Sequence, residues 1–399
     1  YVQHHYSHAA SAFYCSPFAE STVITVDGVG EYSTTTIGYG KNEKLNLIKS
    51  LDFPNSLGLF YSSFTNYLGF KVNTGEYKLM GLAPYGKPIY QEKILDKIIH
   101  LNDDGSYFLN MEYFKFQFKN EMIDKDKIFK LLGVESRNEN QKISQQHEDL
   151  AASVQNVLEK GLINIILAAI KETNCKNISL AGGVALNCKA LGKIGNMNIT
   201  KDIFVQPAAG DAGGSMGCAL ALHYKLSKNK KRIDHKFNVF LGPNLDQKKV
   251  IQFLEKRGCP YKKYNEDELF NIIAKELSNG KIFAICQGKA EWGPRALGNR
   301  SIIANPMVKN IKKTLNLKIK QREDFRPFAP IIDLNHADKI FINSTSSPFM
   351  SNVFYLKENF RDENSTLLIN QKILSSSDLQ NVKASVIHED WSARVQTVE

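Results

Sequence analysis

Two histidines near the start of the sequence have the spacing of a shared metal site. His4 and His8 are four residues apart, so a helix would place both imidazoles on one face, as when two histidines bind one metal ion. On such a helix His5 points about 100° away, so we leave it out of the site. A purification tag would be a longer unbroken run of histidines. Two ordinary helix histidines are the alternative explanation.

Two histidines leave coordination positions unfilled, so carboxylates must come from elsewhere in the chain. Asp27 and Asp211 are the best candidates, because each follows a predicted strand and stands beside a glycine. Each also has an ordinary explanation, a turn aspartate for Asp27 and a helix cap for Asp211. Two imidazoles with two carboxylates suit Fe(II), Mn(II) or Zn(II) better than calcium, and they leave room for a water or a substrate oxygen.

A second candidate site is a basic segment at 287–326, which holds ten Lys and Arg residues against three acidic ones. Planar guanidinium groups grip phosphates with two hydrogen bonds, and glycines let backbone amides approach the same oxygens. We therefore expect an anion-binding pocket here, with a solvated basic face as the alternative. Its expected cationic groups are Arg295, Arg300, Lys320, Arg322 and Arg326, and its expected walls are Trp292, Phe325 and Phe328.

The elements that position these residues follow from local patterns. Residues 23–26 and 34–39 read as two strands of a hairpin, with Asp27-Gly28 as its turn. Residues 149–171 have the periodicity of a long helix. The stretches NISLAGGVALN and VQPAAGDAGGSMGCALAL both predict a strand, a Gly-rich turn and a helix start, where backbone amides can receive an anion.

Beyond these stretches, the basic run at 225–236 predicts a linker and a domain boundary. Asn265 and Glu268 resemble a capping box, which predicts a helix ending near Gly280. The sequence KIFAIC then predicts a strand.

The composition bounds the class of protein. A chain of 399 residues with 43% hydrophobic and 23% charged residues is typical of a soluble protein of two or three domains. No window reaches the ~18 continuous apolar residues of a membrane span. The six cysteines are scattered without a CxxC pair and read as reduced thiols, so we expect a cytoplasmic protein. The net charge of +10 is compatible with nucleic acid or a phosphorylated small molecule as a partner.

Several motifs occur in an order that resembles one family: HHYSHAASAF, VDGVGE, TGEYKLMGLAPYGKP, LAGGVALN, QPAAGDAGGSMG, EWGPRALGNRS, REDFRPFAP and ARVQTV. Together they resemble the O-carbamoyltransferases of nodulation and antibiotic tailoring, nearly end to end. The resemblance implies an α/β protein with an actin/sugar-kinase-like domain at 1–238 and a YrdC-like α/β domain at 239–399. Members begin well before the histidine motif and continue past ARVQTV, so we expect an internal fragment in which both domains are truncated.

The resemblance also implies a chemistry. Carbamoyl phosphate and ATP with Mg²⁺ would give carbamoyl-adenylate in the second domain, and the carbamoyl group would pass to a sugar or natural-product hydroxyl at the metal of the first. By position, His4, His8, Asp27 and Asp211 match the metal ligands, with iron the expected metal and manganese or zinc the alternatives. The remaining matched residues are Gly182, Gly183 and Asn187 for nucleotide in the first domain, Arg295, Arg300, Ser301 and Arg326 for phosphate, and Lys320 and Arg322 for the adenylate. We expect His8, Asp27, Lys320 and Arg322 to act directly in catalysis.

Three alternatives stay open. A threonylcarbamoyl-type tRNA-modifying transferase shares the first domain and would explain the basic charge. A hydrogenase-maturation carbamoyltransferase should carry CxxC repeats upstream, and a non-catalytic nucleotide-binding module would keep only the fold. The end of the chain lacks the family's Asp-Gly-Thr before Ala-Arg, which leaves the role of Arg394 open. The acceptor and the oligomeric state cannot be inferred from the sequence, whereas nucleic acid is not the partner we expect.

Overall fold

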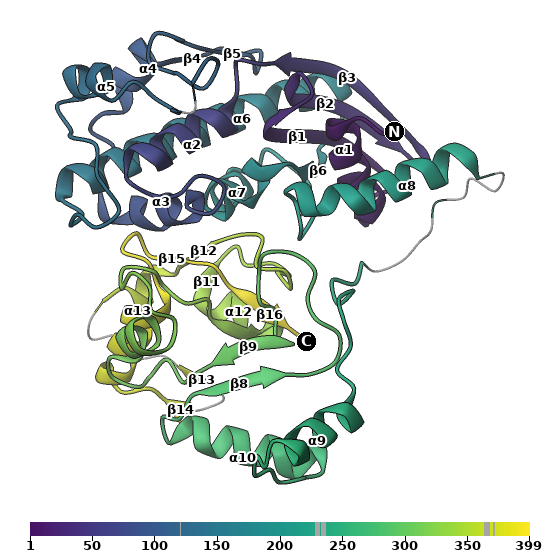
Figure 1. Cartoon of the computed structure of the whole chain (residues 1–399), viewed down its shortest axis with the longest axis vertical. Helices are drawn as coiled ribbons and strands as arrows, with labels where there is room; N and C mark the ends of the chain where they lie inside the picture. Colours follow the sequence, from purple (N-terminus) through teal and green to yellow (C-terminus); the bar gives the residue numbers. More distant parts are fainter. Residues whose placement is uncertain (120, 228–231, 233–236, 363–367, 370–371) are drawn as a thin grey trace. The chain divides into compact units, whose positions relative to one another are not determined.

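The structure is a computed structural model of residues 1–399, and it describes all of them except 120, 228–231, 233–236, 363–367 and 370–371. The chain is a mixed α/β protein whose contacts divide it into two units (Figure 1). Unit 1 contains Tyr1–Phe237 with Ser351–Phe354, and unit 2 contains Asn238–Met350 with Tyr355–Glu399. Most of the predicted linker at 225–236 lies outside the described residues.

Unit 1 is built on one five-stranded sheet. Its strands, in spatial order, are β3 (Lys44–Asp52), β2 (Ser33–Lys41), β1 (Glu20–Gly30), β6 (Asn177–Ala181) and β7 (Asp202–Val205). The first three strands form an antiparallel meander, and β6 and β7 run parallel to β1. Because β1, β6 and β7 are parallel to one another, their carboxyl ends lie at the same end of the sheet.

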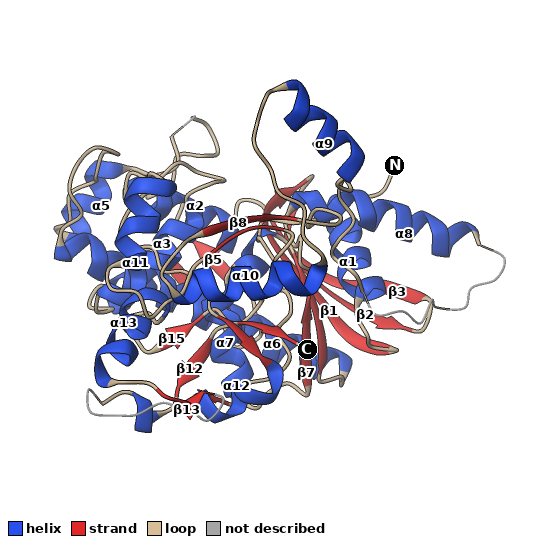
Figure 2. Cartoon of the chain, turned by 90° about the horizontal axis from the view of Figure 1, so that it is seen from below, coloured by secondary structure: helices blue, strands red, loops and turns tan. Residues whose placement is uncertain are grey.

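Helices cover both faces of this sheet (Figure 2). Side chains along β1 point alternately to the two faces and contact different helices. Val23 and Thr25 face α1 (His4–Cys15), which also packs on α8 (Gly214–Leu226). Thr22 faces the opposite side, where its hydroxyl contacts Thr173 at the end of α6 (Gln145–Thr173). The second layer also holds α2 (Leu57–Tyr67), which contacts both β1 and α6.

Small residues let α1 lie close to its neighbours. Ten of its twelve residues are buried, and half of those ten are Ala or Ser. At the crossing with α8, a methyl group added to Gly217 would lie 1.8 Å from the carbonyl oxygen of Ser7. Only glycine therefore permits this approach of the two helices.

The long helix predicted at 149–171 is confirmed as α6. A capping box of Ser144 and His147 starts it, and Asn174 ends it in a left-handed conformation. Among the described residues it is the one helix whose length and composition would allow a membrane span, but 61% of that apolar window is buried inside the protein. It is the central packing helix of unit 1, which explains its apolar character without a membrane.

The predicted hairpin forms, but its turn is elsewhere. The strand β1 continues through Asp27-Gly28 to Gly30, and Glu31 and Tyr32 make the turn. The pairing with β2 is irregular between Val26 and Gly30, so the extra residues are absorbed within the strand as in a β-bulge. The prediction of a turn at Asp27-Gly28 was wrong because Asp27 is held by groups from another strand end.

Both predicted strand–glycine–helix stretches are confirmed. After β6 comes a single 3₁₀ turn, Gly183–Leu186, and then α7 (Cys188–Asn196). After β7 comes the 3₁₀ turn Asp211–Gly213, which leads directly into α8. The remaining elements of unit 1 lie between α2 and α6: α3 (Glu76–Leu82), α4 (Gln91–Lys97), β4 (Ile99–Leu101), β5 (Tyr107–Leu109) and α5 (Lys125–Leu132).

Unit 2 has several small sheets. Antiparallel β8 (Phe283–Cys286) and β9 (Arg300–Ile303) follow α9 (Gln247–Lys256) and α10 (Glu266–Ser278), and β8 confirms the strand predicted at KIFAIC. The capping box before α10 is confirmed, since Asn265 and Glu268 each accept the other's backbone N–H. The other α-helices and strands are α11 (Ile311–Lys313), β10 (Ile331–Asp333), α12 (Leu334–Ile340), β11 (Phe341–Ile342), β12 (Phe354–Leu356, whose first residue is grouped with unit 1), β13 (Leu368–Ile369), β14 (Lys372–Ile373), α13 (Ser376–Val386), β15 (Ser392–Ala393) and β16 (Gln396–Val398).

Candidate metal centre

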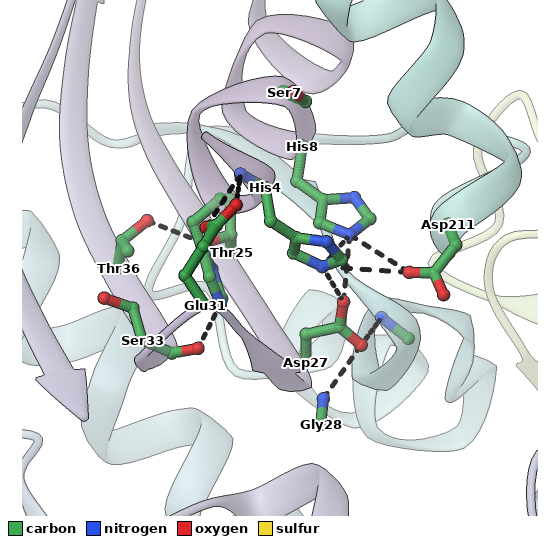
Figure 3. A network of polar contacts seen from close by, with 12 residues as sticks. His4, Ser7, His8, Thr25, Asp27, Gly28, Glu31, Ser33, Thr36 and Asp211 are labelled. Carbon is green, nitrogen blue, oxygen red and sulfur yellow. Dashed lines mark hydrogen bonds and ion pairs between the residues drawn. The ribbon is translucent and has the colours of Figure 1, made fainter. Parts of the chain in front are cut away.

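Four side chains from three segments of unit 1 converge on one point (Figure 3). His4 and His8 lie one turn apart on α1, Asp27 lies near the end of β1, and Asp211 begins the turn before α8. One potential ligand atom from each residue lies within 4.8 Å of all the others. The structure thus brings together the four residues that the sequence suggested as metal ligands.

The distances around Asp27 are short. Its Oδ2 atom lies 2.8 Å from Nε2 of His4 and 2.9 Å from Nε2 of His8. The two Nε2 atoms are 3.0 Å apart, and Oδ1 of Asp211 lies 3.7 Å from both. Three atoms with lone pairs therefore form a triangle with sides of nearly equal length.

Backbone amides fix the orientation of the Asp27 carboxylate. Its Oδ1 atom accepts the N–H of Gly28 at 2.9 Å and the N–H of Gly183 at 3.0 Å. The other oxygen, Oδ2, is thereby left to face the histidines. Ser56, the cap of α2, holds the same strand end by donating to the carbonyl of Gly28.

The start of α1 is held by the hairpin turn. The Glu31 carboxylate accepts the backbone N–H of His4 at 3.1 Å, where the helix begins. Gly30 leaves the space that the His4 ring occupies, since a Cβ atom there would lie 2.2 Å from the ring. His8 is buried, whereas 84% of the Asp211 side chain is exposed, so the site is open to solvent on the Asp211 side.

The carboxylates determine the protonation of the site. Burial lowers the pKa of His8, but its contacts with Asp211 and Asp27 outweigh burial and raise that pKa to about 9. Burial raises the pKa of Asp27, but hydrogen bonds from His4 and His8 hold it well below its ordinary value. The contact with His8 likewise lowers the pKa of Asp211. Both carboxylates are therefore anionic at neutral pH and create a negative site that favours a cation.

The donor set fits a transition metal. Ligands about 2.1 Å from a common centre and at right angles to one another are about 3.0 Å apart, close to the spacing of the three central atoms. Only one proton can occupy the gap between the two Nε2 atoms, whereas a metal ion would use both lone pairs. Imidazole with carboxylate oxygen suits Fe, Mn or Zn. The residues present can therefore hold the expected ion.

The glycine turn after β6 is connected to this site. Gly182 has φ of +93°, and a Cβ atom there would lie 2.2 Å from the carbonyl oxygen of Val26. Gly183 donates to Asp27 as described above. The buried Asn187 side chain caps α7 and exchanges hydrogen bonds with Gln155. A nucleotide-binding role for Gly182, Gly183 and Asn187 stays a prediction.

In unit 2, backbone carbonyls of its own loop and of Pro243 bind Arg300. Its guanidinium donates to the carbonyl oxygens of Gln287 and Asn299 from Nη1, and to those of Pro243 and Gly288 from Nη2. Ser301 accepts the N–H of Gly298, and Arg295 is half-buried in the same loop. These contacts give Arg300 a structural task, and the phosphate-binding roles of the three residues stay predictions.

Glu291, which the sequence analysis did not single out, organises this loop. One of its carboxylate oxygens accepts the backbone N–H groups of Leu297, Asn299 and Arg300 at 2.8–3.0 Å. The signal was present in the sequence, because Glu291 is one of only three acidic residues in the basic segment.

Lys320, Arg322 and Arg326 lie close together. Burial lowers the pKa of Lys320, and the neighbouring Arg322 and Arg326 lower it further. The Nε atom of Arg322 donates to Asn316 at 2.7 Å, and its guanidinium lies 4.8 Å from the Phe328 ring centre. The Nη1 atom of Arg326 lies 3.7 Å from Oε2 of Glu323. This concentration of positive charge could receive an anion, and its assignment to the adenylate stays a prediction.

Comparison with known proteins identifies the family. Residues 1–220 match the family model "Carbamoyltransferase N-terminus", and residues 274–399 match "Carbamoyltransferase C-terminus". An uncharacterized protein of Synechocystis is 41% identical over 99% of this chain and 65% of its own length. Nodulation protein NolNO of Sinorhizobium fredii is 34% identical over 100% of this chain and 54% of its own length.

Nodulation protein NolO of Bradyrhizobium diazoefficiens is 33% identical over 100% of this chain and 67% of its own length. The chain thus spans between 54% and 67% of the length of these three relatives. Two family models match consecutive parts of the sequence, and the motifs that suggested the resemblance lie within the matched parts. The chain belongs to the carbamoyltransferase family.

Proposed function

We propose that this chain takes part in an ATP-dependent O-carbamoyl transfer from carbamoyl phosphate, through carbamoyl-adenylate, to a hydroxyl group of a sugar or natural product. The observation that carries the proposal is the convergence of His4, His8, Asp27 and Asp211 in a chain of this family. We assign the transfer step to this cluster and the activation step to the cationic group of unit 2.

We further propose that unit 1 corresponds to one half of an actin-like domain and unit 2 to a YrdC-like domain. An antiparallel meander followed by two parallel strands, in the order β3-β2-β1-β6-β7, supports the first assignment. The Lys-x-Arg pattern of Lys320 and Arg322, with Arg326 close by, supports the second.

In the transfer step, His4, His8, Asp27 and Asp211 would hold a divalent ion, with Fe(II) expected and Mn(II) or Zn(II) as alternatives. When bound, such an ion supplies a Lewis acid for the carbamoyl oxygen or for the acceptor hydroxyl. Asp27 contributes a fixed anionic oxygen, because two backbone amides hold its carboxylate in one orientation. The exposed Asp211 leaves the site open to an acceptor on that side.

In the activation step, Lys320, Arg322 and Arg326 would bind the phosphates of ATP, which is supplied with Mg²⁺. Guanidinium groups match phosphate oxygens with two parallel hydrogen bonds, and the lysine adds a point charge. In the activation step, water hydrolyses carbamoyl phosphate to carbamate and phosphate, and a carbamate oxygen then attacks the α-phosphorus of ATP, so that pyrophosphate leaves. Attack of the acceptor oxygen on the carbamoyl carbon then releases AMP, and the hydroxyl proton passes to solvent.

The test follows pyrophosphate and the carbamoyl group separately. The protein is incubated with ATP, Mg²⁺ and ¹⁴C-labelled carbamoyl phosphate, with and without a panel of sugar and antibiotic hydroxyl acceptors. We expect pyrophosphate release that requires carbamoyl phosphate, and label on an acceptor only when the metal is present. Transfer of label to tRNA, or ATP binding without any pyrophosphate release, would contradict the proposal.

A further inference from the structure

His5 lies on the first turn of α1, between the two histidines of the candidate metal centre, but it faces the hairpin. It is buried, with 3% of its surface exposed, and both of its ring nitrogens have partners. Nδ1 lies 2.6 Å from the hydroxyl of Thr25 on β1, and Nε2 lies 2.8 Å from the carbonyl oxygen of Ser33 on β2. The ring therefore bridges one helix and two strands.

The direction of each hydrogen bond follows from its partners. The carbonyl of Ser33 can only accept, so Nε2 of His5 carries the hydrogen. In a neutral imidazole that carries its one hydrogen on Nε2, Nδ1 accepts the hydroxyl proton of Thr25. The hydroxyl of Thr36, 2.6 Å from that of Thr25, then donates to it. The series of hydrogen bonds from Thr36 through Thr25 and His5 to Ser33 therefore has one consistent donor-to-acceptor direction.

This hydrogen-bond series is anchored at defined positions of the sheet. Thr25 and Thr36 are direct partners in the β1–β2 ladder, and Ser33 pairs with Gly30 beside the hairpin turn. Thr25 also comes two residues before Asp27 on the same strand. The groups that hold His5 and the carboxylate that faces His4 and His8 therefore belong to one hairpin.

We propose that His5 is a positioning residue that fixes the rotation of α1 against the β1–β2 hairpin, so that Nε2 of His4 and Nε2 of His8 converge on Asp27. Adjacent residues on a helix are 100° apart, so an anchor at His5 restrains rolling of the helix about its axis. A roll would carry both imidazoles away from the carboxylate together. His5 itself does not bind the metal, and the inference rests on the metal site proposed above.

The test measures Co²⁺ affinity and the visible absorption spectrum of the Co²⁺ complex in the full chain, because that spectrum reports ligand geometry. Thr25→Val removes one hydroxyl from the hydrogen-bond series and keeps the side-chain volume nearly constant. His5→Leu removes both hydrogen bonds of the ring. His5→Gln keeps an N–H that can reach Ser33. Tyr6→Phe is the matched control, because it removes another hydrogen bond of α1, the one from the Tyr6 hydroxyl to the carbonyl of Leu45.

We expect Thr25→Val and His5→Leu to weaken Co²⁺ binding at least about tenfold and to change the spectrum, in the range found for residues that orient metal ligands. His5→Gln should lie between these variants and the wild type, and Tyr6→Phe should keep both the affinity and the spectrum. Wild-type affinity and spectrum in folded Thr25→Val would overturn the inference, even if His5→Leu fails to fold. If the wild type itself binds no Co²⁺, the metal site is wrong, and the inference fails with it.

Discussion

The metal cluster of unit 1 and the cationic group of unit 2 hold their side chains in different ways. In the cluster, Asp27 is fixed by two backbone amides, and His8 lies in the core on a helix that is buried along most of its length. In the cationic group, Arg322 binds Asn316 within its own segment, and Arg326 lies beside Glu323. The cluster is positioned by elements far apart in sequence, whereas these contacts of Arg322 and Arg326 lie within ten residues of each other.

The same difference appears in the helices. Ten residues of α1 are buried, whereas α9 and α10 of unit 2 have no buried residue at all. A buried helix restrains its side chains closely, because protein interiors are packed as densely as organic crystals. Packing across unit 1 therefore positions the cluster, whereas Arg322 is held by a hydrogen bond to the buried Asn316 of its own segment.

The largest effect is expected for His8→Ala. Loss of one of four ligands should remove the metal and lower carbamoyl transfer more than about a hundredfold. Carbamoyl-phosphate-dependent pyrophosphate release should stay nearly unchanged, because we assign that step to unit 2. Metal content per chain and the two activities are measured in parallel. Full transfer by a demonstrably metal-free preparation would contradict the role of the cluster.

Arg322→Ala should show the opposite selectivity. Loss of a charge-assisted hydrogen bond to a phosphate oxygen costs about 1.5–3 kcal/mol. Pyrophosphate release should therefore fall at least about tenfold, while the metal stays bound. Arg322→Lys should not restore it, since an ammonium cannot form the two-pronged contact.

The matched control is Arg257→Ala, which removes an arginine that also lies over an aromatic ring of unit 2, that of Phe253, outside the basic segment. It should leave pyrophosphate release unchanged. Equal losses in both arginine variants would show that the effect is not specific to the cationic group.

Gly217→Ala tests the packing on which the cluster depends. The added methyl group would meet the carbonyl of Ser7, which forces α1 and α8 apart and lowers the free energy of unfolding by about 1–3 kcal/mol. Gly195→Ala in α7 is the control, because a methyl group there has no neighbour within 4 Å. That variant should leave stability unchanged or raise it by up to about 1 kcal/mol. Chemical denaturation measures both, and equal stability would argue against a tight helix crossing.

The smallest effect is expected for Asn265→Ala in unit 2. It removes the side-chain acceptor of the capping box and should lower the stability of α10 by about 1 kcal/mol, with no change in metal affinity. Asn265→Asp keeps an acceptor oxygen and should restore stability. A loss of metal from Asn265→Ala would contradict the assignment of the metal site to residues of unit 1 alone.

Local patterns in the sequence predicted several elements of the architecture. The placement of His4 and His8 on one helix face, the long helix α6 and the capping box at Asn265 depend on neighbours within four residues, so spacing alone predicts them. The convergence of Asp27 and Asp211 was suggested by strand ends beside glycines, because parallel strands bring their carboxyl ends to one edge.

Features that depend on distant groups were missed. The Asp27-Gly28 turn was mispredicted, because an amide of Gly183 holds Asp27 and lets β1 run on to Gly30. The bonds from Arg300 to four carbonyls depend on the shape of its loop, which its sequence does not encode in any simple spacing. His5 was set aside as a ligand, and its contacts with Thr25 and Ser33 could not be predicted because they require the packed hairpin.

The separation of Asp211 from the histidines has a consequence for synthesis of the chain. The ribosome makes His4, His8 and Asp27 well before Asp211 and before α8, the helix that packs on α1. A nascent chain can therefore offer three of the four ligands long before the fourth exists. In the proposed metal site, binding by all four ligands must therefore wait until Asp211 has left the exit tunnel, so the complete set forms only when both ends of the segment from His4 to Asp211 can fold together.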